Sequence, residues 1–139
     1  MITTTRISAE EASPLLEACG LPLAGLDDTA LYGTHDEEGR LRAVAGVETY
    51  GDVVLLRSVA TEPASRGQGY ARALCSVLLD GAKQDGVREA FLLTETAEEF
   101  FARLGFRPVP RAAADPRLVA SAEFQEGRCA SAQLMRRQL

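Results

Sequence analysis

The stretch VVLLRSVATEPASRGQGYARALCSVLLDG, residues 53–81, decides the fold of this chain. It begins with a dense run of β-branched and aliphatic side chains, which predicts a strand that is buried on both faces. Pro63 cannot donate a hydrogen bond to a neighbouring strand, so we expect this strand to end near Thr61 or Glu62. Further along, apolar residues recur at the spacing of a helix with one buried face. These residues are Ala71, Leu74, Cys75, Leu78 and Leu79.

The turn between strand and helix, Arg66-Gly67-Gln68-Gly69-Tyr70-Ala71, has the composition of an anion-binding loop. Glycines let the backbone bring several N–H groups to one point, and the helix start adds unpaired donors and a positive dipole end. Arg72 stands where the dinucleotide pattern G-x-G-x-x-G needs its third glycine, which disfavours that geometry. The triphosphate loop requires a lysine that is missing here. A diphosphate group is the expected ligand, and the alternative is a helix start that binds nothing.

Composition and charge place the chain among ordinary globular proteins, with 46% hydrophobic and 25% charged residues. We expect one domain over residues 1–139. The net charge of −5 disfavours nucleic acid as a partner. No apolar run approaches the roughly 18 residues of a membrane span, and the first residues lack the apolar core of a signal peptide. A cytoplasmic protein without membrane contacts is therefore expected.

Cysteine and histidine usage argues against a disulfide framework and against a metal site. Cys19, Cys75 and Cys129 are widely spaced and form no CxxC, and His35 is the single histidine. The helical spacing places Cys75 in the core, whereas Cys129 is either a core residue or part of the lining of a ligand site.

The remaining elements are predicted from the periodicity of apolar residues and from residues that start or end helices and strands. Ser8 and Glu11 form a capping box, and Pro14 predicts a kink or a later start for that helix. We expect strands over residues 2–7, 30–35, 41–50, 87–94, 106–109 and 130–138. A further helix is expected over residues 97–104, with Thr96 as its cap. Another is expected within residues 111–125, starting at Asp115 and Pro116. The strands at 30–35 and 41–50 and the central strand form an antiparallel meander. The strand after the central helix is expected to run parallel to the central strand, which gives a mixed α/β sandwich.

The motif Arg66-x-x-Gly69-x-Ala71 resembles the R/Q-x-x-G-x-G/A signature of the GNAT superfamily of N-acetyltransferases. Its context strengthens the resemblance, because Val59-Ala60-Thr61-Glu62-Pro63 precedes it and Phe100-Phe101-x-x-Leu104-Gly105-Phe106 follows. The resemblance implies an antiparallel meander plus two splayed parallel central strands, flanked by helices. It also implies acetyl-CoA as cosubstrate, no metal, and a small-molecule amine as acceptor. A homodimer is compatible with it.

The stretch from Leu92 to Val109, with Cys129-Ala130-Ser131-Ala132, is similar to a narrower GNAT group named for arsenic-resistance operons. This similarity implies an amino acid or an arsenic-bearing amino acid analogue as acceptor. Arsenate and arsenite carry no amine, so they are not themselves acetylated.

The resemblance also implies the cofactor-binding residues. Backbone N–H groups of residues 66–71 would hold the diphosphate, and Arg72 either adds charge or is a solvated surface residue. The strand edge at Val59, Ala60 and Thr61 would pair with the pantetheine amides, and an N–H near Val59 would stabilise the oxyanion.

For the acceptor's proton, Glu95 and Glu48 are the candidate catalytic bases, and each has an alternative reading as an ordinary strand residue. Many family members carry a tyrosine at the position of Phe101, which cannot protonate a thiolate. Thr94 stands at a position often held by asparagine and is a candidate substrate-binding residue. Phe101 favours an alternative function, a CoA-binding sensor or interaction module without catalysis.

Arg57 interrupts an otherwise apolar strand, where an unpaired guanidinium would be costly. One hypothesis makes it a substrate-binding clamp on an acidic acceptor. The other makes it an internal salt bridge to Glu48 or Glu95.

Overall fold

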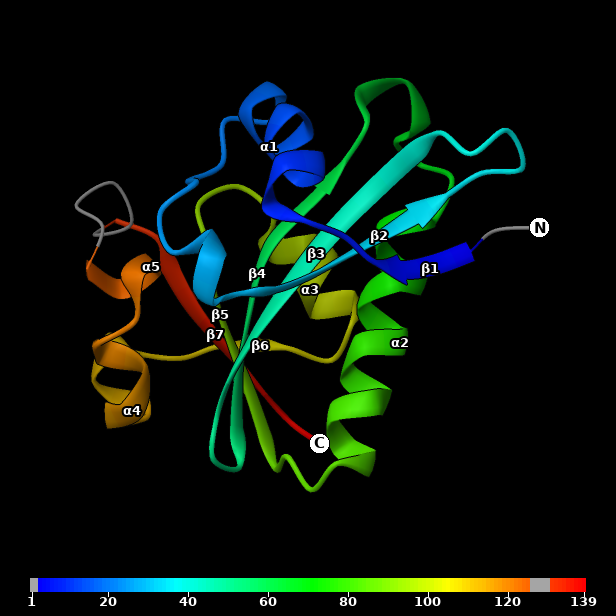
Figure 1. Ribbon diagram of the computed structural model, residues 1–139. Coiled ribbons are helices and arrows are strands. Elements are labelled where there is room, and N and C mark those ends of the chain that lie inside the picture. Colours follow the sequence, from blue (N-terminus) through cyan, green and yellow to red (C-terminus); the bar gives the residue numbers. More distant parts are fainter. Residues whose placement is uncertain (1–2, 126–130) are drawn as a thin grey trace.

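The computed structural model describes residues 3–125 and 131–139, which form a seven-stranded sheet with helices on both faces (Figure 1). The strands are β1 (Thr3–Arg6), β2 (Ala30–His35), β3 (Leu41–Tyr50), β4 (Val53–Thr61), β5 (Glu89–Thr94), β6 (Arg107–Pro108) and β7 (Gln133–Gln138). The α-helices are α1 (Ala9–Ala18), α2 (Tyr70–Gln84), α3 (Glu98–Arg103), α4 (Pro116–Val119) and α5 (Ala122–Gln125). Short 3-10 turns are η1 (Leu26–Asp28), η2 (Pro63–Ser65) and η3 (Arg111–Ala113).

The sheet is mixed, with strand order β1-β2-β3-β4-β5-β7-β6. β1 to β4 pair antiparallel, β4 and β5 pair parallel, and β7 pairs antiparallel with both β5 and β6. The predicted meander, the parallel crossover and the mixed α/β class are confirmed.

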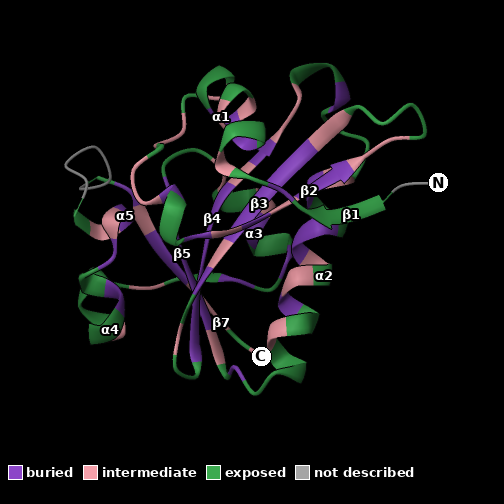
Figure 2. Cartoon of the chain, in the orientation of Figure 1, coloured by how far each residue is buried: buried purple, intermediate pink, exposed green. Residues whose placement is uncertain are grey.

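The helices cover both faces because β4 is apolar on both of its sides. Val54 and Leu56 pack in one core with Leu74 of α2 and with residues of α3. Val53 and Leu55 face the other way and pack with Leu118 of α4. On that second face, a further core carries the buried residues of α1. Figure 2 shows the resulting buried band along the centre of the sheet.

Local signals explain where several elements begin. The Ser8 hydroxyl accepts the N–H of Glu11 at 3.1 Å, as the capping box predicts. α1 begins at Ala9 and continues through Pro14, so the prediction of a later start is wrong. Asp115 caps α4 by accepting the N–H of Arg117 at 2.9 Å.

Several boundaries differ from the sequence expectation, and β5 and β6 are shorter than expected, at Glu89–Thr94 and Arg107–Pro108. Thr96 does not cap α3; the Ala97 N–H donates instead to Thr94 Oγ1 at 3.0 Å. The alanine-rich segment is not one helix, because it turns at Ser121, whose N–H donates to the carbonyl of Leu118. That break separates α4 from α5. β7 begins at Gln133, and the expected start at residue 130 lies outside the described residues.

No helix within residues 3–125 and 131–139 has the length and apolar character needed to cross a lipid bilayer.

Candidate active site

β4 and β5 separate halfway along their length. They pair only where Val53, Val54 and Leu55 lie beside Glu89, Ala90 and Phe91. Beyond that point β5 stays paired with β7 as far as Thr94. The edge of β4 from residue 57 onward therefore faces an opening in the middle of the sheet, which is the splay that the family resemblance implies.

A β-bulge at Ser58 accompanies the opening. The register of β3 against β4 shifts between Val44 and Gly46, which leaves an extra residue in β4. Ser58 has φ of 57°, a left-handed conformation that costs a non-glycine residue roughly 1–3 kcal/mol. The Nε of Arg57 donates to the Ser58 hydroxyl at 3.1 Å and helps to hold this backbone.

An outer groove lies at the end of β4 and beside the start of α2. Its lining includes most of the predicted cofactor residues near the strand edge, together with the residue after α1 and residues at or just before the start of α3: Cys19, Val59, Ala60, Thr61, Arg66, Gly67, Ala71, Thr96, Ala97 and Phe100. The walls are mainly backbone and small or apolar side chains, which suits a ligand that pairs with main-chain groups.

The glycine loop forms the outer end of this groove. Gly67 and Gly69 have φ of 82° and 83°, which the glycines adopt without strain. Gly69 is the N-cap of α2, so the N–H groups at residues 70–72 have no acceptor inside the helix. Gln68 and Arg72 are exposed, whereas Tyr70 packs partly against the core.

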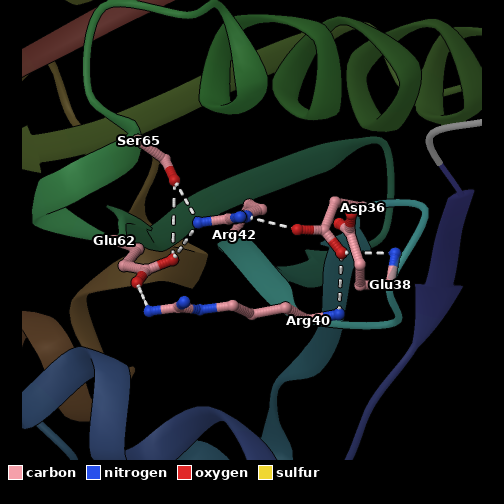
Figure 3. Close-up of polar contacts among 6 residues, drawn as sticks. All are labelled: Asp36, Glu38, Arg40, Arg42, Glu62 and Ser65. Atoms are coloured by element: carbon pink, nitrogen blue, oxygen red, sulfur yellow. Dashed lines mark hydrogen bonds and ion pairs between the residues drawn. The ribbon is translucent and has the colours of Figure 1, made fainter.

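An ionic network holds the segment that leads into the loop (Figure 3). Arg42 on β3 donates through Nη1 to Glu62 at 2.9 Å and to Ser65 at 3.0 Å, and through Nε to Asp36 at 2.7 Å. Arg40 also pairs with Glu62. The network therefore ties η2, directly before the glycine loop, to the turn between β2 and β3.

An inner pocket of about 180 Å³ lies at the other end of the opening. It shares Val59, Thr96 and Ala97 with the outer groove. Thr94 and Glu95, both predicted site residues, line it. The Thr94 hydroxyl accepts the Ala97 N–H, whereas Glu95 is exposed.

A buried polar cluster lies behind this pocket. The Arg57 side chain is 0% exposed, and its Nη1 donates to Glu48 Oε2 at 2.9 Å. Thr29 donates to the same oxygen at 2.8 Å, and the Tyr50 hydroxyl donates to Glu48 Oε1. Burial and the Glu48 carboxylate raise the pKa of Tyr50 to about 12. The salt bridge to Glu48, one of the two readings of Arg57, is present.

Glu123 on α5 is a site residue that the sequence analysis missed. It lines the inner pocket, its side chain is 7% exposed, and its Oε2 lies 3.4 Å from Arg57 Nε. Burial raises the pKa of Glu123 to about 7, against the opposing effect of the Arg57 charge. No spacing pattern connects Glu123 to Arg57; the only local signal was an acidic side chain between Ser121 and Phe124.

The remaining predicted residues occupy simpler environments. Phe101 is buried, with its ring edge-to-face against Phe100 and Phe106 at centroid distances of 5.0 and 6.1 Å. Cys75 is in the core, where burial raises the pKa of its thiol to about 12. Cys129 lies outside the described residues. In the part of the chain that is described, no group of three His, Cys, Asp or Glu side chains could hold a metal ion.

Solved structures with this fold include several that contain coenzyme A. N-acetylglutamate synthase from Neisseria gonorrhoeae, complexed with coenzyme A and L-arginine, superposes with a TM-score of 0.79 at 16% identity over 99% of this chain. This chain spans 33% of that protein. Rv2747 from Mycobacterium tuberculosis, in complex with CoA, gives a TM-score of 0.77 at 19% identity and covers 99% of both chains. An acetyltransferase of the GNAT family from Staphylococcus aureus Mu50 gives 0.81 at 12% identity, over 100% of this chain and 99% of that one.

Sequence comparison supplies the family. No curated protein matches this sequence significantly. The acetyltransferase (GNAT) domain matches residues 27–108, which is more than half of the chain and includes the whole of the opening between β4 and β5. This chain belongs to the GNAT family of acetyltransferases.

Proposed function

We propose that this protein transfers the acetyl group of acetyl-CoA to the amine of a small molecule. The observation that carries the proposal is that the outer groove and the inner pocket meet at Val59, in the opening between β4 and β5. A cofactor in the outer groove and an acceptor in the inner pocket would face each other there, and such positioning supplies much of the catalysis in acyl transfer.

The cofactor would be held mainly by backbone groups. The N–H groups of residues 66–71 would bind the diphosphate at the start of α2, and Arg72 would add positive charge nearby. Pantetheine amides would pair along Val59, Ala60 and Thr61. An N–H at the Ser58 bulge, close to Val59, would stabilise the oxyanion of the tetrahedral intermediate.

The leaving thiolate would depart without a side-chain acid at the family position. Phe101 carries no proton and is enclosed by Phe100 and Phe106. A free thiol has a pKa of about 8.5, so its thiolate is a moderate leaving group that can leave unaided or take a proton through water.

The acceptor that we propose is an amino acid or an arsenic-bearing amino acid analogue, acetylated in the cytoplasm without a metal. The small size of the inner pocket supports a small acceptor. Thr94 and Glu95 would contact it there, because both line the pocket. For Arg57 we propose a positioning role, since its buried guanidinium is engaged by Glu48, Ser58 and Glu123.

The test measures thiol release from acetyl-CoA against a panel of amines that includes neutral and acidic amino acids, together with the melting temperature in the presence of CoA. CoA binding raises the melting temperature of the folded state. Gly69→Glu should abolish this rise, because its φ of 83° strains any side chain and the new charge repels the diphosphate.

Gly81→Glu is the matched control. It adds the same charge to the exposed side of the same helix, where a Cβ meets nothing within 4 Å and φ is not positive. It should keep the CoA response. A wild-type protein that melts at the same temperature with and without CoA would refute both the site and the function.

A second candidate function is a CoA-binding sensor or interaction module. Phe101 at the family's tyrosine position favours it. A CoA-dependent rise in melting temperature without thiol release for any amine would select this alternative.

A further inference from the structure

We propose that Glu123 is the catalytic base of this enzyme: its carboxylate binds the acceptor's ammonium group in the inner pocket and takes its proton, with Arg57 as the positioning residue behind it. This inference deepens the proposed function and rests on it. It gives the pocket a proton acceptor that neither Glu48 nor Glu95 supplies as well.

The two carboxylates that flank Arg57 are unequal. Glu48 accepts hydrogen bonds from Arg57, Thr29 and Tyr50, so both of its oxygens are occupied, and it does not line the inner pocket. Glu123 does line the pocket. Its Oε2 lies 3.4 Å from Arg57 Nε, and its Oε1 is buried without a hydrogen-bond partner among the residues that the structure describes. A buried oxygen left in this state is costly, and a donor in the pocket would relieve the cost.

The charges around Glu123 favour a cationic guest. Arg57 on β4 is one positive charge between two buried carboxylates, Glu48 on β3 and Glu123 on α5. Glu95, at the end of β5, adds a second acidic side chain to the pocket lining. Arg111 is a further cation, but its guanidinium stacks on the Phe124 ring at 5.6 Å and Arg111 does not line the inner pocket. The buried carboxylates therefore outnumber the guanidinium between them, and an ammonium group would balance the charge.

Burial also gives Glu123 the proton affinity that a base needs at neutral pH. Its pKa of about 7 lies far closer to that of an amine than an exposed glutamate's does. Glu95 is exposed on the pocket rim, where water competes for its hydrogen bonds. The carboxylate with the suitable environment is the one contributed by α5.

The acceptor ammonium gives one proton to Glu123 Oε1, and the freed lone pair forms the C–N bond to the thioester carbonyl carbon. The C–S bond then breaks, and the thiolate receives the second proton that the nitrogen loses. The products are the N-acetylated amine and CoA thiol, while the proton on Glu123 leaves to solvent at the pocket mouth beside Glu95.

The same charge pattern predicts which acceptors are preferred. The charged side chains that the structure places in the inner-pocket lining are Glu95 and Glu123, both acidic. An acceptor with an uncompensated carboxylate would meet repulsion there. Among amino acids and other amines, those with a neutral or cationic side chain should therefore be used better than those with an acidic side chain, which is the opposite of the preference that an Arg57 clamp would give.

The experiment compares wild type, Glu123→Gln, Glu95→Gln and Glu10→Gln, using thiol release with putrescine, glycinamide and L-glutamate as acceptors across the pH range. We expect Glu123→Gln to lower kcat by about 100-fold or more and to lose the rise of kcat with pH. The CoA-dependent rise in melting temperature should remain. Glu10 is exposed on the first turn of α1, and Glu10→Gln is the matched control that should behave as wild type.

Each outcome is informative. Wild-type turnover with an unchanged Glu123→Gln profile would overturn the inference alone, as would loss of the pH limb in Glu95→Gln instead. If wild type binds CoA but releases no thiol with any amine, the proposed function fails and the inference fails with it. Should Glu123→Gln not fold, the wild-type comparison still decides, because a higher kcat/KM for L-glutamate than for glycinamide contradicts the charge pattern.

Discussion

Two of the clusters in which one arginine is held between two carboxylates differ in how far the arginine is buried. Arg42 lies between Asp36 and Glu62 near the surface, with 22% of its side chain exposed. Arg57 lies between Glu48 and Glu123, and its side chain is 0% exposed. The first cluster precedes the glycine loop, and the second lies behind the inner pocket.

The two environments shift carboxylate pKa values in opposite directions. The backbone N–H of Arg40, with the Arg42 guanidinium, lowers the pKa of Asp36. Burial raises the pKa of Glu123 despite its guanidinium neighbour. The two side chains are similarly enclosed, at 9% and 7% exposed, so the difference lies in hydrogen bonding. Asp36 accepts from the backbone N–H groups of Glu38 and Arg40 and from Arg42, which stabilises its charged form, whereas Glu123 Oε1 has no partner among the described residues.

The largest expected difference between the clusters is in stability. Arg57→Met would leave Glu48 and Glu123 buried without a counter-charge, and we expect it to lower the free energy of unfolding by about 3–5 kcal/mol. Arg57→Lys should recover only part of this, because an ammonium cannot reproduce the planar fork. Arg42→Met should have a much smaller effect in the same urea titration.

A different result for Arg57 would restore the clamp hypothesis. If Arg57→Ala folds normally, keeps its CoA affinity and raises KM tens-fold for L-glutamate but not for glycinamide, the guanidinium binds an acidic acceptor. Equal losses for both amines would leave Arg57 a positioning residue.

The next largest effect is the pH dependence of stability. Glu123 titrates near its ordinary value of 4.5 when unfolded and at about 7 when folded, so the folded state holds its proton more tightly. Its contribution is therefore fully present below pH 4.5 and is lost as pH rises through 7. Glu123→Gln should gain stability relative to wild type over this window, on the order of 2–3 kcal/mol in urea titrations at several pH values.

Asp36 provides the contrast of sign. Its folded pKa is lowered from 3.8, so its contribution is present above pH 3.8 and is lost as pH falls through the folded value. Asp36→Asn should therefore lose stability relative to wild type at neutral pH and approach it in acid. Parallel pH curves for Asp36→Asn and Glu123→Gln would contradict the opposite pKa shifts assigned to these two groups.

Phe101 tests whether the cofactor end of the site supplies an acid. We expect Phe101→Leu to cost about 1–2 kcal/mol through lost packing against Phe100 and Phe106, without changing the pH profile of turnover. Phe101→Tyr should raise activity modestly, because it restores a hydroxyl at the family position. A pH dependence that disappears specifically in Phe101→Leu would refute the assignment.

The smallest expected effect is on cofactor affinity through the surface cluster. Arg42→Met should weaken CoA binding about two- to five-fold, as expected for a partly exposed ion pair that orders a neighbouring loop. Calorimetric titration with CoA measures it. Arg117→Met is the matched control, since Arg117 also lies between two carboxylates, Asp52 and Asp115, but at the opposite end of β4. Equal loss in both variants would show that Arg42 has no special relation to the loop.

Much of the cofactor end could be predicted from the sequence because its determinants are local. Two glycines, the strand before them and the apolar stripe of α2 lie within one continuous stretch, and backbone N–H groups at a helix start need no distant partner. The end of β4 at Thr61, the Ser8 cap and the burial of Cys75 follow in the same way from short-range chemistry.

The acceptor end depended on the tertiary structure. The bulge at Ser58 leaves no signature in the spacing of nearby residues. Glu123 lies beside Arg57 only because the segment after β6 breaks at Ser121 into two short helices, α4 and α5. Glu95 and Glu123 are the same residue type in the sequence. The fold leaves Glu95 in water and buries Glu123. Because desolvation raises the pKa of a carboxyl group, only the folded chain decides which of the two can act as a base at neutral pH.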